Sequence, residues 1–284
     1  MLHVTHLLLI LSAAAAVQAP DVTVERGVVF GMHSGLALLM DVHRPQTPNG
    51  LAIVYVPGSG FHTPLGYDAQ PITRYTAPYV PALTRAGYTV FVINHRAAPR
   101  FRYPAAVEDV QRAVRYVRHQ AARFGIAPDR IGAAGYSSGG TLASLLGVLD
   151  APGDAGHTDP VQRESARVQC VVAGGGAFDF TQVKTVIGLP VVGSYLGSTI
   201  ALGYGEGGPE YRTYKEGSPR FHVSAGDAPT LLVHGDADEI LPFAQAEAME
   251  GALRDAGVPV KLVRMPGGTH FNRGHRVRQT TSQK

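Results

Sequence analysis

The segment Gly135-Tyr136-Ser137-Ser138-Gly139 decides the fold because of what stands on either side of it. The apolar run at 131–134 is typical of a buried strand, and the apolar run at 141–146 is typical of a helix. A Gly-x-Ser-x-Gly segment at such a junction predicts a turn so sharp that the neighbours of the serine have room for almost no side chain. The turn lifts the Ser137 hydroxyl clear of the backbone and aims the helix N-terminus at any negative charge formed there. Ser137 is therefore the candidate nucleophile.

Length and composition favour one large α/β domain. The chain has 284 residues, of which 17% are charged and 34 are glycine. Its formal charge of +3 gives little field to attract nucleic acid, so we expect no nucleic-acid partner. The arginines between residues 96 and 118 are expected to form a solvated helix face. The single cysteine, Cys170, excludes an intrachain disulfide, and its apolar neighbours predict a small buried side chain.

The first residues predict an export signal. Residues 7–17 form an apolar run much shorter than the roughly twenty residues that span a bilayer. Val17-Gln18-Ala19 places small residues where a signal peptidase cuts, although no Lys or Arg precedes the run and Pro20 follows it. We expect a signal peptide at 1–19, a domain at 20–284, and a secreted or periplasmic protein with no stable membrane span. The alternative is a disordered leader.

Apolar and amphipathic runs alternate along the rest of the chain. Besides the elements around Ser137, we expect strands at 22–30, 36–42, 51–56, 88–93, 168–173, 229–234 and 260–265, and helices at 79–86, 104–123 and 244–256. This alternation predicts a mostly parallel sheet of about eight strands with helices on both faces, and ligands beyond the carboxyl ends of its strands. Residues 178–223 interrupt the alternation, which favours a lid-like insertion over surface decoration.

A serine hydroxyl needs a base beside it, and 12 histidines are available. His270 follows the last expected strand in a flexible loop, which gives the chain order serine, acid, histidine. His275, in the polar tail, is its rival. His95 and His234 stand at strand ends and are expected to be structural hydrogen-bonding residues.

The base needs a carboxylate that fixes its tautomer and stabilises its charged form. Two aspartates follow the strand at 229–234, and Asp238 is the one we select. Asp236 is expected to hydrogen-bond within the turn. Asp179 is a third candidate. The same segment lacks the histidine partners that a zinc site needs, so we expect no metal.

The negative oxygen formed during attack requires backbone donors aimed at it. We expect these from the amide of Ser138 and from the amides of Ser59 and Gly60 in the loop after the strand at 51–56. A glycine-rich loop can also cradle phosphate, but no phosphate or dinucleotide signature accompanies this one, and we expect no cofactor.

Three further segments match patterns of a known family: Met40–Pro45, Asn94–Ala106 with Asp109, and Ser218-Pro219 ahead of 229–238. Together with the Ser137 segment they resemble the esterase/lipase branch of the α/β-hydrolase superfamily, above all its acetyl-xylan/feruloyl-esterase-like and hormone-sensitive-lipase-like enzymes. The resemblance covers residues 36 to 272 and implies an α/β-hydrolase fold. The chain departs from the family in two places. Pro57 and Ser59 replace a histidine and a glycine of the usual His-Gly-Gly-Gly loop, and only a short polar tail follows His270.

These observations predict a serine carboxylic-ester hydrolase that uses Ser137, His270 and Asp238 on small or medium acyl esters and forms an acyl-enzyme. Its partner is then a small-molecule ester. Two alternatives stay open: a weakly active or inactive binding protein of this fold, which the short tail favours, and a serine amidase or peptidase of the same fold.

Overall fold

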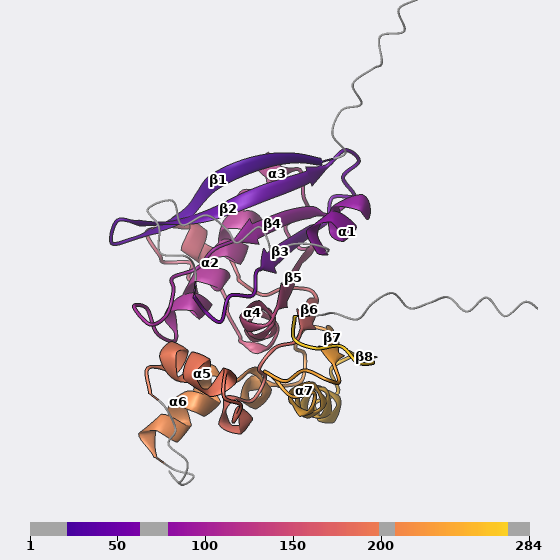
Figure 1. The fold of residues 1–284 in the computed structure, drawn as a ribbon. Coiled ribbons are helices and arrows are strands. Elements are labelled where there is room, and N and C mark those ends of the chain that lie inside the picture. Colours follow the sequence, from indigo (N-terminus) through magenta and orange to yellow (C-terminus); the bar gives the residue numbers. More distant parts are fainter. Residues whose placement is uncertain (1–21, 63–78, 199–207, 272–284) are drawn as a thin grey trace, which may run out of the picture.

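An eight-stranded sheet forms the centre of the molecule (Figure 1). The computed structural model describes residues 22–62, 79–198 and 208–271. The strand order is β1-β2-β4-β3-β5-β6-β7-β8, with β1 and β2 antiparallel to their neighbours and parallel pairing from β4 to β8. The strands are β1 (Val22–His33), β2 (Leu36–Pro45), β3 (Ala52–Val56), β4 (Thr89–Ile93), β5 (Ile131–Tyr136), β6 (Val171–Gly174), β7 (Thr230–Gly235) and β8 (Val260–Met265). The predicted mostly parallel sheet of about eight strands is confirmed.

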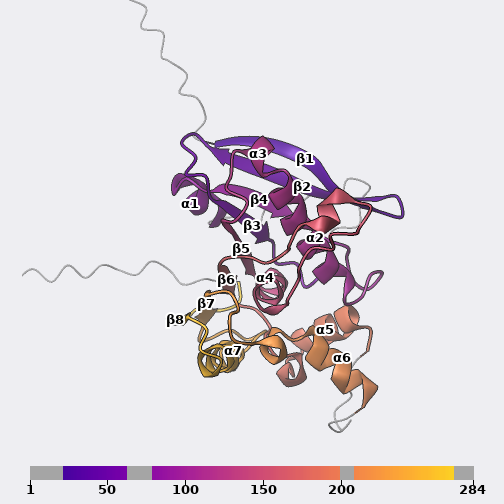
Figure 2. The same ribbon diagram turned by 180° about the vertical axis from the view of Figure 1, so that it is seen from behind.

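Helices cover both faces of the sheet. The α-helices are α1 (Tyr79–Arg85), α2 (Ala105–His119), α3 (Ala121–Phe124), α4 (Ser138–Val148), α5 (Gly188–Leu196), α6 (Pro209–Gly217) and α7 (Ala244–Asp255). The 3-10 helices are η2 (Pro160–Arg163), η3 (Phe180–Gln182), η4 (Pro219–His222). Figure 2 shows the same arrangement from behind, with α5 and α6 together at the end of the molecule far from β1.

Alternate residues of the central strands point to opposite faces of the sheet, as the pleat requires. Val54 and Val56 of β3 join the larger apolar cluster, which also contains the buried faces of α2, α4 and α7. Ile53 and Tyr55 of the same strand join a smaller cluster against α1. Because both faces are covered, the central strands are continuously apolar, and this is why the sequence reveals them so clearly.

Two expectations about the exposure of side chains are wrong. Cys170 is exposed, because β6 begins only at Val171 and the residues before it lie at the end of the sheet, where the Gln169 side chain accepts a hydrogen bond from the Ile131 amide. The arginines do not form one solvated face. Arg96 is only 7% exposed, and its Nε donates to both carboxylate oxygens of Asp109 at 2.9 and 3.0 Å. A buried guanidinium in that geometry is held by the carboxylate that neutralises it.

The segment expected to be a lid-like insertion, 178–223, contains η3, α5, α6 and η4. That it acts as a lid stays a prediction. The proposed signal peptide at 1–19 and the rival histidine His275 lie outside the described residues. Among the helices of residues 22–62, 79–198 and 208–271, none combines the length and apolar character that a membrane crossing needs.

Candidate active site

Ser137 occupies a strained turn between β5 and α4. Its backbone angles, φ 55° and ψ −128°, lie in a region that residues with a side chain rarely adopt. A Cβ at Gly135 would clash with the backbone of Gly139, and a Cβ at Gly139 would clash with the carbonyl of Val56. The Ser137 amide donates to the Gly174 carbonyl at 2.8 Å, which ties the turn to β6. The two glycines are therefore needed for the backbone to close around the serine.

Three side chains from distant segments form one hydrogen-bonded line at the carboxyl ends of β5, β7 and β8. His270 Nε2 lies 3.0 Å from Ser137 Oγ, and His270 Nδ1 lies 2.7 Å from Asp238 Oδ2. His270 is 5% exposed and Asp238 is 7% exposed. The line thus lies in a largely dry environment, where its polar contacts are stronger than in water.

Asp238 is ionised at neutral pH. Burial opposes its ionisation, but the hydrogen bonds from His270 and from the Leu241 amide outweigh burial and lower the pKa of Asp238 below its usual value of 3.8. Its Oδ1 also accepts from the amides of Ile240 and Leu241, at 3.0 and 2.8 Å. An ionised carboxylate can only accept, so His270 Nδ1 carries the proton and Nε2 is left to accept from the Ser137 hydroxyl.

The loops that carry the acid and the base are joined to each other. The Ala237 amide donates to the Gly268 carbonyl at 3.0 Å, and the Gly267 amide donates to Asp236 Oδ1 at 2.7 Å. Asp236 also accepts from Arg264 Nε at 2.9 Å, and this hydrogen bond is the main reason why the pKa of Asp236 is lowered. The expectation that Asp236 hydrogen-bonds within its own turn is wrong, because its carboxylate reaches across to Arg264 and Gly267 of the neighbouring segment.

The other polar candidates have different partners. Asp179 accepts from Arg220 at 2.6 Å and from the Thr181 hydroxyl at 2.5 Å, whereas Asp238 is the carboxylate that reaches His270. His234 Nε2 donates to the Leu241 carbonyl at 2.8 Å and lies 3.5 Å from Asp238 Oδ2. Burial is the main cause that lowers the pKa of His234, so this imidazole is neutral at pH 7.

His95 also plays the structural part expected of it. Its Nδ1 lies 2.9 Å from the Arg96 carbonyl, and burial is the main cause that lowers its pKa. Both strand-end histidines therefore bind backbone carbonyls close to them in the chain.

The three backbone amides expected to donate hydrogen bonds to the oxyanion differ in their surroundings. The Ser59 amide donates to Ser138 Oγ at 2.9 Å, so it already has a partner. Ser138 is the first residue of α4, so its own amide has no carbonyl partner within the helix. Gly60 has a φ of 62°, and a Cβ placed there would meet Val191 of α5. Because the Ser59 amide is engaged by Ser138, the amides of Gly60 and Ser138 are the stronger candidates for oxyanion donors.

Sequence reasoning gave no role to Tyr136, the residue before the candidate nucleophile. Its phenol donates to the backbone carbonyl of His270 at 2.7 Å, and the two rings are 5.5 Å apart. The Ser138 hydroxyl was missed as well. The only sequence signal for either is its place in the turn, since both partners belong to distant segments.

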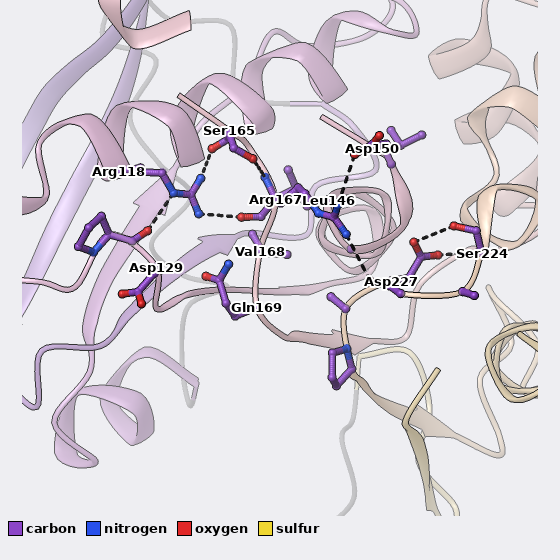
Figure 3. Close-up of a pocket in the computed structure, with 17 residues that line it drawn as sticks. Arg118, Asp129, Leu146, Asp150, Ser165, Arg167, Val168, Gln169, Ser224 and Asp227 are labelled. Carbon is purple, nitrogen blue, oxygen red and sulfur yellow. Dashed lines mark hydrogen bonds and ion pairs between the residues drawn. The ribbon is translucent and has the colours of Figure 1, made fainter. Parts of the chain in front are cut away.

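A separate cavity of about 750 Å³ lies at the amino ends of β5, β6 and β7 (Figure 3). Several of its charged groups have partners within the protein. The Arg118 guanidinium donates to the backbone carbonyls of Pro128, Ser165 and Arg167, while Asp227 accepts from the amide and hydroxyl of Ser224. The Ser137 line is at the other end of the strands. Within the described residues no cluster of three or more His, Cys, Asp or Glu side chains is arranged to hold a metal ion.

Known proteins that are similar in sequence or in fold include several esterases. A truncated carbohydrate esterase from gut microbiota has a TM-score of 0.73 and 26% identity, covering 90% of this chain and 92% of that one. An acetyl ester-xyloside bifunctional hydrolase from Caldicellulosiruptor lactoaceticus has a TM-score of 0.73 and 26% identity, covering 86% of each chain. The probable carboxylic ester hydrolase LipM of Mycobacterium tuberculosis is 29% identical over 68% of this chain and 44% of LipM.

The sheet topology, the strained serine turn and these similarities define an α/β-hydrolase of the esterase/lipase class. The BD-FAE family model matches residues 40–253, well over half of the chain. The chain belongs to the BD-FAE family. It spans between 44% and 59% of the length of the first curated relatives it matches.

Proposed function

We propose that this protein is a serine carboxylic-ester hydrolase that acts on small or medium acyl esters through an acyl-enzyme. The single observation that carries the proposal is the hydrogen-bonded line Ser137–His270–Asp238, with distances of 3.0 and 2.7 Å. Its three members come from separate loops, and the hydroxyl stands at a strained turn, as is common at active sites.

Acylation begins when Ser137 Oγ attacks the ester carbonyl carbon and His270 Nε2 takes the hydroxyl proton. Asp238 stabilises the imidazolium that forms. The amides of Gly60 and Ser138 donate to the oxyanion, and the positive end of α4 adds to their effect. The carbon–oxygen bond to the alcohol then breaks, His270 returns the proton to the departing alkoxide oxygen, and the acyl group stays on Ser137.

Deacylation repeats the proton transfers with water. His270 takes a proton from a water molecule as that water attacks the acyl carbon, and it then returns the proton to Ser137 Oγ as the acid leaves. This cycle draws on groups of the chain itself and on water.

The surroundings of the loop that carries Ser59 and Gly60 favour a substrate with a compact, uncharged acyl group. Val191 of α5 is near enough to Gly60 to meet a Cβ placed there at 3.4 Å, so an aliphatic side chain borders the loop. The truncated carbohydrate esterase and the acetyl ester-xyloside hydrolase among the similar structures are in keeping with esters of short acids on carbohydrates. We propose acetylated carbohydrates as the first substrates to test.

The decisive experiment compares wild type with Ser137→Ala on p-nitrophenyl acetate and p-nitrophenyl butyrate, and labels both with a fluorophosphonate. Wild type is expected to turn over both esters and to take the label at Ser137. Loss of the nucleophile should lower kcat at least about 10⁴-fold. Ser144→Ala is the matched control, because Ser144 lies in α4, is buried, and its hydroxyl has no hydrogen-bond partner in the part of the chain that is described.

Two outcomes would overturn the proposal. Equal turnover by wild type and Ser137→Ala would remove Ser137 from the chemistry. A wild-type protein that neither hydrolyses the esters nor takes the label would favour a binding protein of this fold.

We also propose that the protein is exported, on the strength of the apolar run at 7–17 and the small residues that follow it. N-terminal sequencing of the protein recovered from a bacterial periplasm tests this. A first residue of Pro20 supports cleavage, and retention of residues 1–19 contradicts it.

A further inference from the structure

We propose that Tyr136 is a positioning residue for His270, and that it matters most after the acyl-enzyme has formed. The proposal rests on the proposed function. Its starting point is that two consecutive residues of the serine turn bind the two ends of one histidine. Tyr136 Oη donates to the His270 backbone carbonyl at 2.7 Å, and Ser137 Oγ lies 3.0 Å from the His270 imidazole.

The Tyr136 ring is held in place by the strand beside it. A Cβ at Gly174 would lie 2.7 Å from the ring, and a Cβ at Gly175 would lie 2.9 Å from the phenol oxygen. The ring therefore occupies the space where these two residues would carry side chains. Tyr136 is 9% exposed, and Tyr79 stacks near it with ring centres 6.3 Å apart. A ring confined in this way presents its hydroxyl at a fixed point.

Within the described residues, the hydrogen bond from Tyr136 is the shortest polar contact of the His270 main chain. The His270 amide lies 3.5 Å from Glu239 Oε2, which is a weak contact for a hydrogen bond, and the next residue, Phe271, is 74% exposed. The turn before it is anchored through Gly267 and Gly268, three and two residues away. The short, buried hydrogen bond from Tyr136 is thus the firm attachment of the His270 main chain to the serine turn.

This attachment has a different value at the two stages of the reaction. In the free enzyme the Ser137 hydroxyl also binds the imidazole. In the acyl-enzyme Ser137 Oγ is esterified and has no proton to donate, so that hydrogen bond is lost. His270 is then held by Asp238 at Nδ1 and by Tyr136 at its carbonyl while Nε2 activates water. Removing the phenol hydroxyl should therefore slow deacylation more than acylation.

Tyr136→Phe removes the hydroxyl and keeps the ring. Rapid mixing with p-nitrophenyl acetate should show kcat about tenfold lower than in wild type, with kcat/KM lowered only about twofold, because kcat/KM reports acylation. A burst approaching about one p-nitrophenol per active site should appear as the acyl-enzyme accumulates. Active sites are counted with the fluorophosphonate label.

Tyr103→Phe is the matched control. Tyr103 also donates its phenol to a backbone carbonyl, that of Glu216, at 2.8 Å, and it lies outside the Ser137 line. Both variants should lose a few degrees of melting temperature at most, with the larger loss in Tyr136→Phe, because its hydrogen bond is buried and that of Tyr103 is exposed. Tyr103→Phe should keep the wild-type kcat and show no new burst.

The outcomes separate the two proposals. An active wild type, an inactive Ser137→Ala and an unchanged kcat in Tyr136→Phe would overturn the role of Tyr136 and leave the proposed function intact. Equal losses of kcat and kcat/KM in Tyr136→Phe, without a burst, would overturn the specific link to deacylation and point to packing alone. An inactive wild type overturns both proposals.

Discussion

The two ends of the central strands use their polar groups in opposite ways. At the amino ends, around the cavity of Figure 3, charged side chains such as Arg118 are held by backbone carbonyls, three of which accept from its guanidinium. At the carboxyl ends Ser137 stands in a strained turn, and within the described residues its hydroxyl hydrogen-bonds to the His270 imidazole alone. Matched groups stabilise the fold, whereas groups with donors and acceptors to spare are available for chemistry.

The largest expected effect comes from replacing the acid of the Ser137–His270–Asp238 line, which lies at the carboxyl ends of the strands. Asp238→Asn replaces an acceptor-only group with an amide, which allows the wrong tautomer of His270, and should lower kcat about 10⁴-fold. Ester hydrolysis at saturating substrate measures this loss. Asp236→Asn is the control, because Asp236 binds Gly267 and Arg264 rather than His270. Comparable losses in the two variants would contradict the assignment of Asp238.

A substitution at the amino ends of the strands should instead lower the stability of the fold and leave the activity unchanged. Arg118→Met leaves the carbonyls of Pro128, Ser165 and Arg167 without their donor and should lower the free energy of unfolding by about 2 kcal/mol. Urea unfolding measures this change, and kcat should stay at the wild-type value. Arg130→Met, at an exposed arginine nearby, should change neither quantity. A fall in kcat with Arg118→Met would show that the two ends are coupled, against the separation inferred from the structure.

Much of this comparison could be predicted from the sequence, for physical reasons. Strands covered on both faces are continuous apolar runs, so β3, β4 and β5 stand out, and parallel strands bring their carboxyl ends together. Ser137, Asp238 and His270 could be selected because each follows such a strand. The contact between the serine turn and the loop that carries His270 could not be predicted in the same way. Tyr136 and its partner are 134 residues apart, and no periodicity encodes that contact.

The two errors about exposure share one cause. Cys170 was expected to be buried because its neighbours are apolar, and Arg96 was expected to be solvated because it is charged. Exposure depends on where a strand begins and on which distant element packs against it. Asp109, 13 residues further along, brings Arg96 inside. Hydropathy identifies which residues can form a core, and tertiary contacts decide which of them do.

A smaller effect is expected at the contact between α4 and the loop that carries Ser59 and Gly60. Ser138→Ala removes the hydroxyl that binds the Ser59 amide but keeps the backbone amide of residue 138. The loop then loses one attachment, and kcat should fall about three- to tenfold. Steady-state kinetics on p-nitrophenyl acetate, with Ser144→Ala alongside, measures it. An increase in kcat would mean instead that the freed Ser59 amide is the better oxyanion donor.

The smallest expected effect is a pH dependence of stability that comes from Asp238, at the carboxyl ends of the strands. The folded-state pKa of Asp238 lies below its ordinary value of 3.8, so its ionised form stabilises the fold above that value, and this contribution is lost as the pH falls through the folded pKa. Melting temperatures of wild type and Asp238→Asn should differ by a constant amount from pH 7 down to about pH 5 and converge below about pH 4. Asp236→Asn, measured alongside, corrects for the general effect of losing one carboxylate, because the pKa of Asp236 is lowered as well.

A difference between wild type and Asp238→Asn that stays constant through the acid range would mean that the carboxylate contributes by its shape and not by its charge. The pairing of Asp238 with His270 would then be weaker than the 2.7 Å distance between their side chains indicates.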